Sequence, residues 1–292
     1  MRIVQLIDSL EAGGAERMAV NYANALSEKI AFSGIVATRK EGLLLDKIKN
    51  KSGYLFLNKK DAIDIASIFK LRKYCVQYKI DFIQAHSSSF FLAVLVKLTL
   101  PKVKIIWHDH YGNSEFLKNR KYFVLQLFSL FFHRILVVNQ LLLDWNKEKM
   151  FCKKVIYLPN FPEIESLGGT TELNGINGKR IICLANIRSQ KNIEMLIEVA
   201  KKVSEKKSDI TFHVVGKKFN DSYQEKIFQL IENNALKNTV FLYDSKNDIP
   251  NILKQSTIGV LTSSSEGLPV SVLEYGLSKL PVIATNVGQI KE

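Results

Sequence analysis

Cysteine is scarce in this 292-residue chain, and long hydrophobic runs are absent from it. The three cysteines, Cys75, Cys152 and Cys183, are widely spaced and form no C-x-x-C pair. An odd number of cysteines at such spacing disfavours both a disulfide framework and a zinc site, and it predicts reduced thiols in the cytosol. No apolar run approaches the roughly 18 residues that a membrane span needs, so we expect none.

Two sequence signatures that would place the chain in other classes are also missing. The N-terminal apolar run is short and is followed at once by Asp8 and Glu11, so it predicts a strand rather than a signal peptide. No G-x-G-x-x-G fingerprint occurs, which disfavours a dinucleotide-binding enzyme.

The formal net charge of +13 is unevenly distributed along the chain. Residues 1–150 contain 23 Lys and Arg against 13 Asp and Glu, whereas residues 151–292 contain 18 against 15. This excess favours an anionic partner for the first part, such as nucleic acid, acidic lipid or a phosphorylated substrate. A basic face that only keeps the protein soluble is an equally good interpretation. Nucleic acid is disfavoured because the chain has no interleaved aromatic stacking motif and no recognition module.

Apolar runs of strand length alternate with amphipathic segments along the whole chain. The predicted strands are residues 2–8, 33–38, 81–86, 103–108, 134–139 and 154–159, then 180–187, 210–216, 239–244, 257–263 and 281–286. Continuous Val, Ile and Leu strands separated by helices indicate parallel sheets covered on both faces. A stretch rich in Pro, Gly and Asn near 159–179 is the natural linker.

The predicted fold class is therefore α/β, with two Rossmann-like, doubly wound domains. The first covers residues 1–160 and the second residues 175–292. In such pairs, ligands bind beyond the carboxyl ends of the strands, in the cleft between the domains.

Two places in the first domain carry candidate site residues. Gly13 and Gly14 follow the first strand and precede a helix, where small residues let backbone N–H groups approach a phosphate or a sugar. A tight strand-to-helix turn is the alternative. His108 and His110 lie two apart at a strand end and would share a face, and His86 ends the preceding strand as a weaker candidate. A metal pair is poorly supported, because no third ligand has motif spacing.

The first loop of the second domain places two cations before a helix. Arg188 and Lys191 follow the strand at 180–187. Cations are unfavourable at a helix N-terminus, and a bound anion between them would remove the conflict. A solvated loop is the alternative interpretation.

The stretch SSSEGLPVSVLEYG, which begins at residue 263, combines a turn with two acids. Gly267 frees the backbone, and Pro269 suits the first turn of a helix whose N–H groups form an anion site. Glu266 lies at the edge of this turn, and Glu274 lies more than one turn into the helix. Carboxylates accept hydrogen bonds from hydroxyl groups, so a phosphate site flanked by two acids fits a nucleotide sugar.

With these motifs in this order, the sequence resembles retaining glycosyltransferase family 4, whose members have the GT-B fold. EGLPVSVLE matches the E-x7-E pattern of the family, and GGAER, HSSS, WHDH, the Arg/Lys loop and HVVG occur in the family's order. The resemblance covers essentially the whole chain. Because the family usually continues beyond TNVGQIKE, the second domain is expected to be truncated at its C-terminal end.

The resemblance implies a role for each candidate residue. Glu266 would lie beside the hydroxyls of the donor sugar, and Glu274 would hold the ribose. Lys191 and Arg188 would neutralise the departing diphosphate, although the family usually has its arginine directly after a glycine. His108 would act at the sugar face. The expected catalytic residues are His108, Glu266, Lys191 and Arg188, and the expected substrate-binding residues are Gly13, Gly14, His86, His110, Gly267, Leu268, Pro269 and Glu274.

The predicted function is transfer of a hexose-type sugar from a nucleoside-diphosphate sugar to a glycan or lipid-linked acceptor, with retention of anomeric configuration, in cell-surface polysaccharide synthesis. Since no D-x-D occurs, we expect neither a metal nor a cofactor. The alternatives are an inactive or regulatory nucleotide-sugar-binding protein and a nucleotide-sugar 2-epimerase.

The segment 116–135 is expected to be a helix that carries four basic residues and six aromatic residues. A long apolar helix usually belongs to the core. The alternative is weak association of this basic domain with an anionic membrane surface, peripheral on the inner face of the cell membrane.

Overall fold

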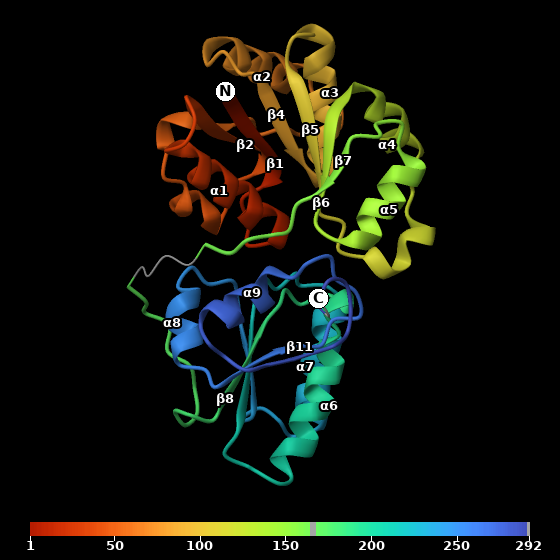
Figure 1. The fold of residues 1–292 in the computed structure, drawn as a ribbon. Helices are drawn as coiled ribbons and strands as arrows, with labels where there is room; N and C mark the ends of the chain where they lie inside the picture. The colour runs from red at the N-terminus through yellow and green to blue at the C-terminus, as the bar shows by residue number, and fades with distance from the viewer. Residues whose placement is uncertain (164–167, 291–292) are drawn as a thin grey trace. The chain divides into compact units, whose positions relative to one another are not determined.

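The computed structural model describes residues 1–163 and 168–290. The chain forms two compact units, Met1–Phe161 and Pro162–Glu292. Each unit has its own parallel β-sheet with helices packed against it (Figure 1).

Unit 1 contains a seven-stranded parallel sheet with the strand order β3-β2-β1-β4-β5-β6-β7. The chain runs outward from β1 to β3 and then returns to β4 beside β1, so the strand order reverses between β1 and β4. Ligands of doubly wound folds bind at such a reversal. The strands are β1 (Arg2–Ser9), β2 (Phe32–Lys40), β3 (Tyr54–Phe56), β4 (Phe82–His86), β5 (Lys104–Asp109), β6 (Phe132–Val137) and β7 (Val155–Tyr157). The helices are α1 (Gly14–Ser27), α2 (Ile65–Gln77), α3 (Phe90–Thr99), α4 (Phe123–Phe128) and α5 (Gln140–Lys149).

Unit 2 contains a five-stranded parallel sheet with the order β10-β9-β8-β11-β12, which reverses between β8 and β11. Its strands are β8 (Arg180–Leu184), β9 (Thr211–Val215), β10 (Val240–Tyr243), β11 (Ile258–Leu261) and β12 (Val282–Ala284). Its helices are α6 (Ile193–Ser204), α7 (Ser222–Asn233), α8 (Ile249–Lys254) and α9 (Val270–Leu277).

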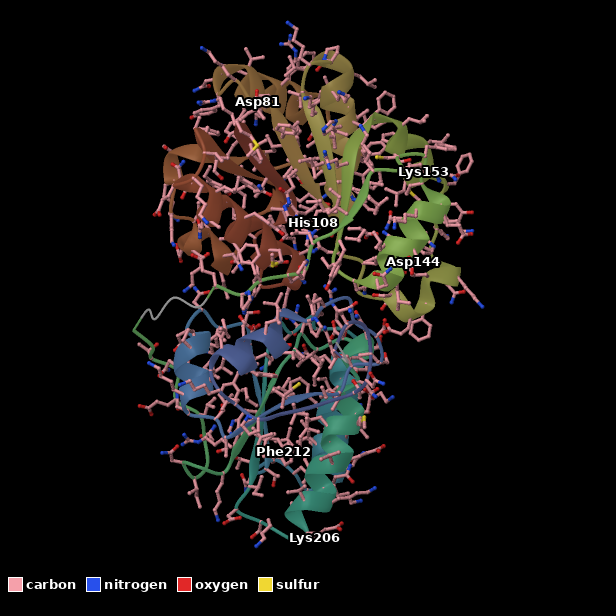
Figure 2. All side chains as sticks on the ribbon, in the orientation of Figure 1. Asp81, His108, Asp144, Lys153, Lys206 and Phe212 are labelled. Carbon is pink, nitrogen blue, oxygen red and sulfur yellow. The ribbon has the colours of Figure 1, made fainter. Side chains whose placement is uncertain are left out.

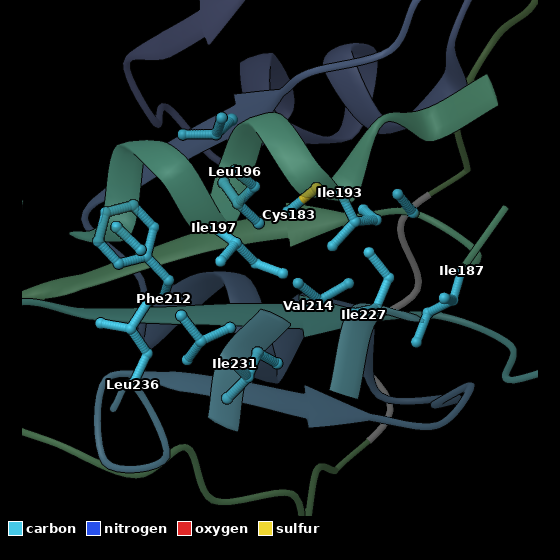
Figure 3. Close-up of a cluster of buried hydrophobic side chains, with 14 residues drawn as sticks. Cys183, Ile187, Ile193, Leu196, Ile197, Phe212, Val214, Ile227, Ile231 and Leu236 are labelled. Atoms are coloured by element: carbon cyan, nitrogen blue, oxygen red, sulfur yellow. The ribbon is translucent and has the colours of Figure 1, made fainter. Parts of the chain in front are cut away.

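Alternate side chains of the strands in unit 2 enter two different cores. Cys183 and Val214 pack with residues of α6 and α7 such as Leu196 (Figure 3). Their neighbours Ile182 and Val215 pack on the opposite face with residues of α8 and α9. A strand that is buried on both faces must be apolar at successive positions. The expectation of parallel sheets covered on both faces is therefore confirmed.

The strands expected from the sequence are all present, with ends that differ by a few residues. Strand β3 was not predicted from the sequence, and it is only three residues long. The expected linker near 159–179 includes residues 164–167, which lie outside the described residues. Leu173, within the same stretch, is buried in the core of unit 2.

The expected helix over 116–135 was wrong. The structure has a 3₁₀ turn at Ser114–Asn119, the six-residue α4, a second 3₁₀ turn at Ser129–Phe131, and then β6. Phe132 and Ile135 are buried in β6. Aromatic and β-branched side chains that pack in a sheet override the helical spacing of the segment before them.

A close contact in unit 2 gives a prediction about stability. A Cβ atom on Gly259 of β11 would lie 2.5 Å from Cδ2 of the buried Tyr275 ring, whereas a Cβ on the exposed Gly276 of α9 would meet nothing within 4 Å. Overpacking a core typically costs about 1–3 kcal/mol. We expect Gly259→Ala to destabilise unit 2 by about that amount, whereas Gly276→Ala is neutral or stabilises by up to about 1 kcal/mol. Urea unfolding followed by circular dichroism measures both, and equal midpoints for the two variants would contradict this packing.

Candidate functional site

Three histidines meet at the carboxyl end of the sheet in unit 1. His86 ends β4 and lies in register with His108 of β5, and His110 follows β5 directly. The ring centroids of His108 and His110 are 4.0 Å apart, and those of His86 and His110 are 5.1 Å apart with the rings stacked. Figure 2 labels His108 at this end of the strands. The structure therefore brings together the three histidines that the sequence singled out.

Two buried glutamines on β1 and β4 contact the histidine rings through their side-chain amides. Oε1 of Gln5 accepts a hydrogen bond from Nε2 of His86 at 2.8 Å, and Nε2 of Gln84 lies 3.1 Å from Nδ1 of His108. Nδ1 of His86 lies 2.9 Å from Nε2 of His110. Because Gln5 and Gln84 are neighbours in the paired strands β1 and β4, the sheet itself fixes the orientation of these rings.

Three buried polar atoms around these rings have no hydrogen-bond partner within the described part of the chain. They are Nε2 of His108, Nε2 of Gln5 and the hydroxyl of Tyr22, whose ring centroid lies 5.5 Å from that of His108. A buried polar atom left unsatisfied costs about 1–3 kcal/mol. Several of them together mark a place where polar groups of a ligand would be stabilised.

The three imidazoles are neutral at neutral pH. Burial lowers the pKa of His86 and of His108 well below its ordinary value, and the neighbouring His110 adds to this effect. Burial also lowers the pKa of His110 to about 4, although the Asp109 carboxylate opposes the shift. Most of the ring nitrogens already have protein partners, and a remaining neutral nitrogen such as Nε2 of His108 suits a sugar hydroxyl better than a phosphate.

Asp109, between the two histidines of the WHDH motif, is a structural anchor. Its carboxylate accepts two hydrogen bonds from the Arg120 guanidinium at 2.7 and 2.9 Å and a third from Asn146 at 2.9 Å. The guanidinium lies 4.2 Å from the ring centroid of Tyr111 and 4.4 Å from that of Trp145. A bidentate ion pair that is also stacked on aromatic rings fixes the segment 110–120 over the end of β5.

A cavity of about 930 Å³ opens beside His110. One part of its wall is polar and contains Ser88, Asp109 and Arg120, and another part is formed by Tyr122 to Gln126 at the start of α4. Trp107 and Tyr111 contribute aromatic surface. Aromatic faces beside hydroxyl and charged groups suit a saccharide, and the apolar wall suits a hydrocarbon chain.

Gly13 and Gly14 lie at the start of α1, with Gly13 as its N-cap residue. The φ angle of Gly13 is −137°, so this turn does not require glycine for its backbone conformation. A Cβ on Gly14 would have no atom within 4 Å. The Glu16 carboxylate lies beside Gly13, so the open surface at this end of α1 is on the side of Gly14.

In unit 2, Lys191 and Glu266 form a salt bridge. Lys191 ends a 3₁₀ turn (Ser189–Lys191) after β8, and Glu266 follows β11. Nζ of Lys191 lies 2.5 Å from Oε1 of Glu266, and the Ser263 hydroxyl donates to the same oxygen at 2.6 Å. The side chain of Lys191 is about one fifth exposed and that of Glu266 is almost fully buried. A partly exposed lysine held by a buried acid is available to a bound anion.

The loops after β8 and β11 are joined by hydrogen bonds. Ser264 N–H donates to the Gln190 carbonyl at 2.9 Å, and the Gln190 side chain donates to the Ser265 carbonyl at 2.7 Å. The Thr262 hydroxyl donates to the Lys191 carbonyl at 3.0 Å. These bonds fix the position of Lys191 relative to Glu266 across the reversal of strand order.

The turn before α9 has a slightly different register from the expected one. Pro269 is the N-cap residue of α9, so the helix begins at Val270, one position after the expected start. The extended backbone of Pro269, with ψ of 119°, excludes it from the helix. Gly267 accepts a backbone hydrogen bond from Gln289 at 3.0 Å, and Leu268 is half-buried beside it. Glu274 is buried in α9, more than one turn from its start.

Arg188 is exposed and adds a second cation to the loop after β8. Its guanidinium lies 4.4 Å from the ring centroid of Phe219, and Nζ of Lys217 lies 5.1 Å from the same centroid. Asn192, which follows Lys191, has a positive φ of 48° and is the N-cap residue of α6. The three cations therefore belong to neighbouring loops at the carboxyl ends of β8 and β9, where the expected anion would bind.

Four residues of the unit 1 site were not predicted from the sequence: Gln5, Gln84, Tyr22 and Arg120. A signal for the two glutamines was available, because each interrupts a buried apolar strand, and buried amides are almost always hydrogen-bonded. The ring neighbours of Tyr22 lie far away in sequence, and Arg120 meets Asp109 only through the fold of an irregular loop, so no periodic pattern could identify either residue.

Comparison with known proteins gives a consistent result. Residues 12–164 match the family model described as Glycosyltransferase Family 4, and residues 173–292 match the model described as Glycosyl transferases group 1. The structure of Anabaena HepE in complex with UDP and glucose is similar, with a TM-score of 0.77 at 15% identity over 99% of this chain and 82% of that chain. The pneumococcal O-GlcNAc transferase GtfA in complex with UDP and GlcNAc has a TM-score of 0.72 at 11% identity, over 98% of this chain and 84% of that chain.

Two curated relatives are similar in sequence. An uncharacterized glycosyltransferase of Haemophilus influenzae is 25% identical over 288 residues, which are 94% of this chain and 77% of the relative. The UDP-Gal:alpha-D-GlcNAc-diphosphoundecaprenol alpha-1,3-galactosyltransferase of Escherichia coli is 27% identical over 253 residues, which are 78% of this chain and 63% of the relative.

Two parallel-sheet, Rossmann-like units with these structural likenesses define the GT-B fold. The two family models identify the chain as a glycosyltransferase. Because the first family model covers more than half of the chain, the chain belongs to glycosyltransferase family 4. The resemblance seen in the sequence motifs is thereby confirmed.

Proposed function

We propose that this glycosyltransferase moves a hexose-type sugar from a nucleoside-diphosphate sugar to a glycan or lipid-linked acceptor, with retention of anomeric configuration. The observation that carries the proposal is the Lys191–Glu266 pair at the reversal of strand order in unit 2. A cation that can meet a departing diphosphate lies there beside a buried acid that can accept hydrogen bonds from a sugar.

Each role in donor recognition follows from the surroundings of the side chain. Lys191 and Arg188 provide positive charge after β8, and backbone N–H groups come from Gly267, Leu268 and the first turn of α9, because Pro269 has none. Glu274 is buried and holds the ribose hydroxyls, while Glu266 accepts from the sugar. With lysine and arginine neutralising the leaving group, transfer needs neither a metal ion nor a cofactor.

For the acceptor, we assign the cavity beside His110 in unit 1. Ser88, His110 and Tyr111 offer the polar and aromatic surface that a saccharide needs, and Phe123, Val124 and Leu125 make another part of the wall apolar. The relative from E. coli is named for an acceptor that is a diphosphoundecaprenol-linked sugar. An acceptor with a saccharide, an anionic linkage and a hydrocarbon chain fits both parts of this wall, which supports a role in cell-surface polysaccharide synthesis.

The proposed place of action is the inner face of the cell membrane. Between residues 1 and 290, the described helices include none that is long and apolar enough to cross a bilayer. The region around α4 exposes six large apolar side chains, namely Phe116, Phe123, Val124, Leu127, Leu130 and Phe131. Lys118 and Lys121 are exposed in the same segment. Apolar groups flanked by lysines favour peripheral contact with anionic lipid.

The roles proposed for Lys191 and Glu274 predict that one substitution lowers mainly the turnover number and the other mainly the affinity for the donor. Lys191 meets charge that grows as the bond to the leaving group breaks, so we expect Lys191→Ala to lower the turnover number about a hundredfold or more with a smaller change in donor affinity. Glu274 meets the ribose in the ground state, so Glu274→Gln should weaken donor binding about tenfold, which corresponds to about 1.4 kcal/mol. Calorimetry with a panel of nucleoside-diphosphate sugars and release of the free nucleotide give the two quantities.

The matched controls for this pair are Lys201→Ala and Glu198→Gln on the exposed face of α6, which should change neither quantity. Unchanged turnover in Lys191→Ala, or unchanged donor affinity in Glu274→Gln, would contradict the assigned role.

His108 is expected to act on the donor sugar rather than to bind the nucleotide. His108→Ala should remove nearly all transfer, at least about a hundredfold, while nucleotide binding survives. His108→Gln, which keeps a polar side chain of similar size, and His133→Ala on β6 serve as folding and histidine controls. An active double variant that lacks both His108 and His110 would refute this assignment.

The surface around α4 predicts salt-sensitive binding to lipid. The full chain should co-sediment with anionic vesicles at low salt and dissociate at high salt, because each Lys or Arg near the surface contributes about 1 kcal/mol. The double variant Phe123→Ser/Leu130→Ser should lose this binding, whereas Ile65→Ser/Phe69→Ser, at two exposed apolar positions of α2, should retain it. Failure of the wild-type chain to bind anionic vesicles at low salt would reject the membrane proposal.

A further inference from the structure

The histidine cluster of unit 1 has the geometry of a metal site. One nitrogen from each of His86, His108 and His110 lies within 4.8 Å of the other two. We propose that these three histidines bind a transition-metal ion of the Zn²⁺ type, and that the bound ion inhibits transfer. This inhibitory role rests on the proposed function of His108 at the donor sugar, whereas metal binding itself does not.

The hydrogen bonds that join Gln5 and Gln84 to the histidine rings leave the nitrogens that face the centre of the cluster available to a metal ion. Nε2 of His86 donates to Oε1 of Gln5, so its Nδ1 keeps a lone pair on the side of His110. Nδ1 of His108 faces the Gln84 carboxamide, so Nε2 is the nitrogen of His108 left for a ligand. A half-turn of the Gln84 amide presents its oxygen to an Nδ1–H group, which gives His108 the tautomer that a metal requires. Metal-bound histidines usually have such outer partners.

A buried atom without a partner points to the same place. Nε2 of His108 is fully buried and has no hydrogen-bond partner in the described residues. A metal ion among the three rings satisfies this nitrogen. Zn²⁺ binds imidazole nitrogen at about 2.0–2.1 Å, which places two such nitrogens about 3.4 Å apart in a tetrahedral site. The 2.9 Å separation of His86 Nδ1 and His110 Nε2 must therefore widen by about half an ångström, and any separation near the 4.8 Å limit must shorten as the rings turn toward the ion.

The ligands select the kind of ion. Three imidazoles suit Zn²⁺, Ni²⁺, Co²⁺ or Cu²⁺, whereas Mg²⁺, Mn²⁺ and Ca²⁺ prefer oxygen. The nearby carboxylate of Asp109 is committed to Arg120, so it adds no oxygen ligand. With three protein ligands, the fourth position of a tetrahedral ion stays open to water or to a substrate hydroxyl.

The proposed inhibition follows because Nε2 of His108 would serve both as a metal ligand and as a contact of the donor sugar. A metal ion bound to His108 removes that ring from contact with the donor sugar. We therefore expect Zn²⁺ to inhibit transfer reversibly and EDTA to restore it, while Mg²⁺ has no effect. This behaviour agrees with a reaction that itself needs no metal.

The decisive experiment measures metal binding without any substrate. The purified full chain is stripped with a chelator and titrated with Zn²⁺ by calorimetry, and separately with Co²⁺, whose visible absorption reports its coordination. We expect one ion per chain, a spectrum of four-coordinate Co²⁺, and a loss of affinity of at least about a hundredfold in His110→Ala. Gln84→Leu, which removes only an outer partner, should weaken binding about 10–100-fold.

Two controls address the other metal-binding side chains. His133→Ala and Cys152→Ser remove a histidine and a partly exposed cysteine outside the cluster, and both should bind Zn²⁺ like the wild type. His110 lies beyond the end of β5 and is partly exposed, so its removal should leave the circular dichroism spectrum unchanged. Absence of stoichiometric binding, or equal affinity in wild type and His110→Ala, would overturn the metal site. Metal binding in a chain that transfers no sugar would support the site while contradicting the proposed function.

Discussion

The constraint on which both units depend is the burial of a parallel sheet on its two faces. Successive side chains of the central strands enter a core, as Ile182 and Cys183 do, so these strands leave little room for polar side chains other than hydrogen-bonded ones such as Gln5 and Gln84. Polar side chains gather instead where the strands end. His86 and His108 do so in unit 1, and Lys191 and Glu266 do so in unit 2. Each pair lies beside a position where the strand order of its sheet reverses.

The two strand-end sites differ in charge, and this difference agrees with the division of roles proposed for them. Burial keeps the histidines of unit 1 neutral, and their orientation comes from the amides of Gln5 and Gln84. In unit 2, the buried carboxylate of Glu266 holds a lysine that solvent still reaches. Neutral groups that donate and accept suit hydroxyls, whereas a lysine at a loop suits a diphosphate. A backbone with positive φ follows the key residue in both sites, at Ser87 after His86 and at Asn192 after Lys191.

The sequence predicted those features that depend on local pattern. Runs of Val, Ile and Leu located the long strands, and polar residues at the ends of those runs located the histidines, Lys191 and Glu266. The prediction of a helix over 116–135 was wrong, because the apolar residues at helical spacing extend into residues that form strand β6. Sequence spacing also gave no third residue beside His108 and His110, whereas strand register places His86 next to His108. The anchoring of Asp109 by Arg120 requires a folded loop and had no signal in the sequence.

The central claim is that the carboxyl end of the sheet in unit 2 binds the nucleoside diphosphate of the donor. Hydrogen–deuterium exchange of the full chain, with and without saturating UDP or another nucleoside diphosphate, tests it most directly. The account predicts slower exchange at residues 186–192 and 263–274, with little change in the buried strand β9. Protection confined to unit 1, or no protection with any nucleoside diphosphate tested, would contradict it.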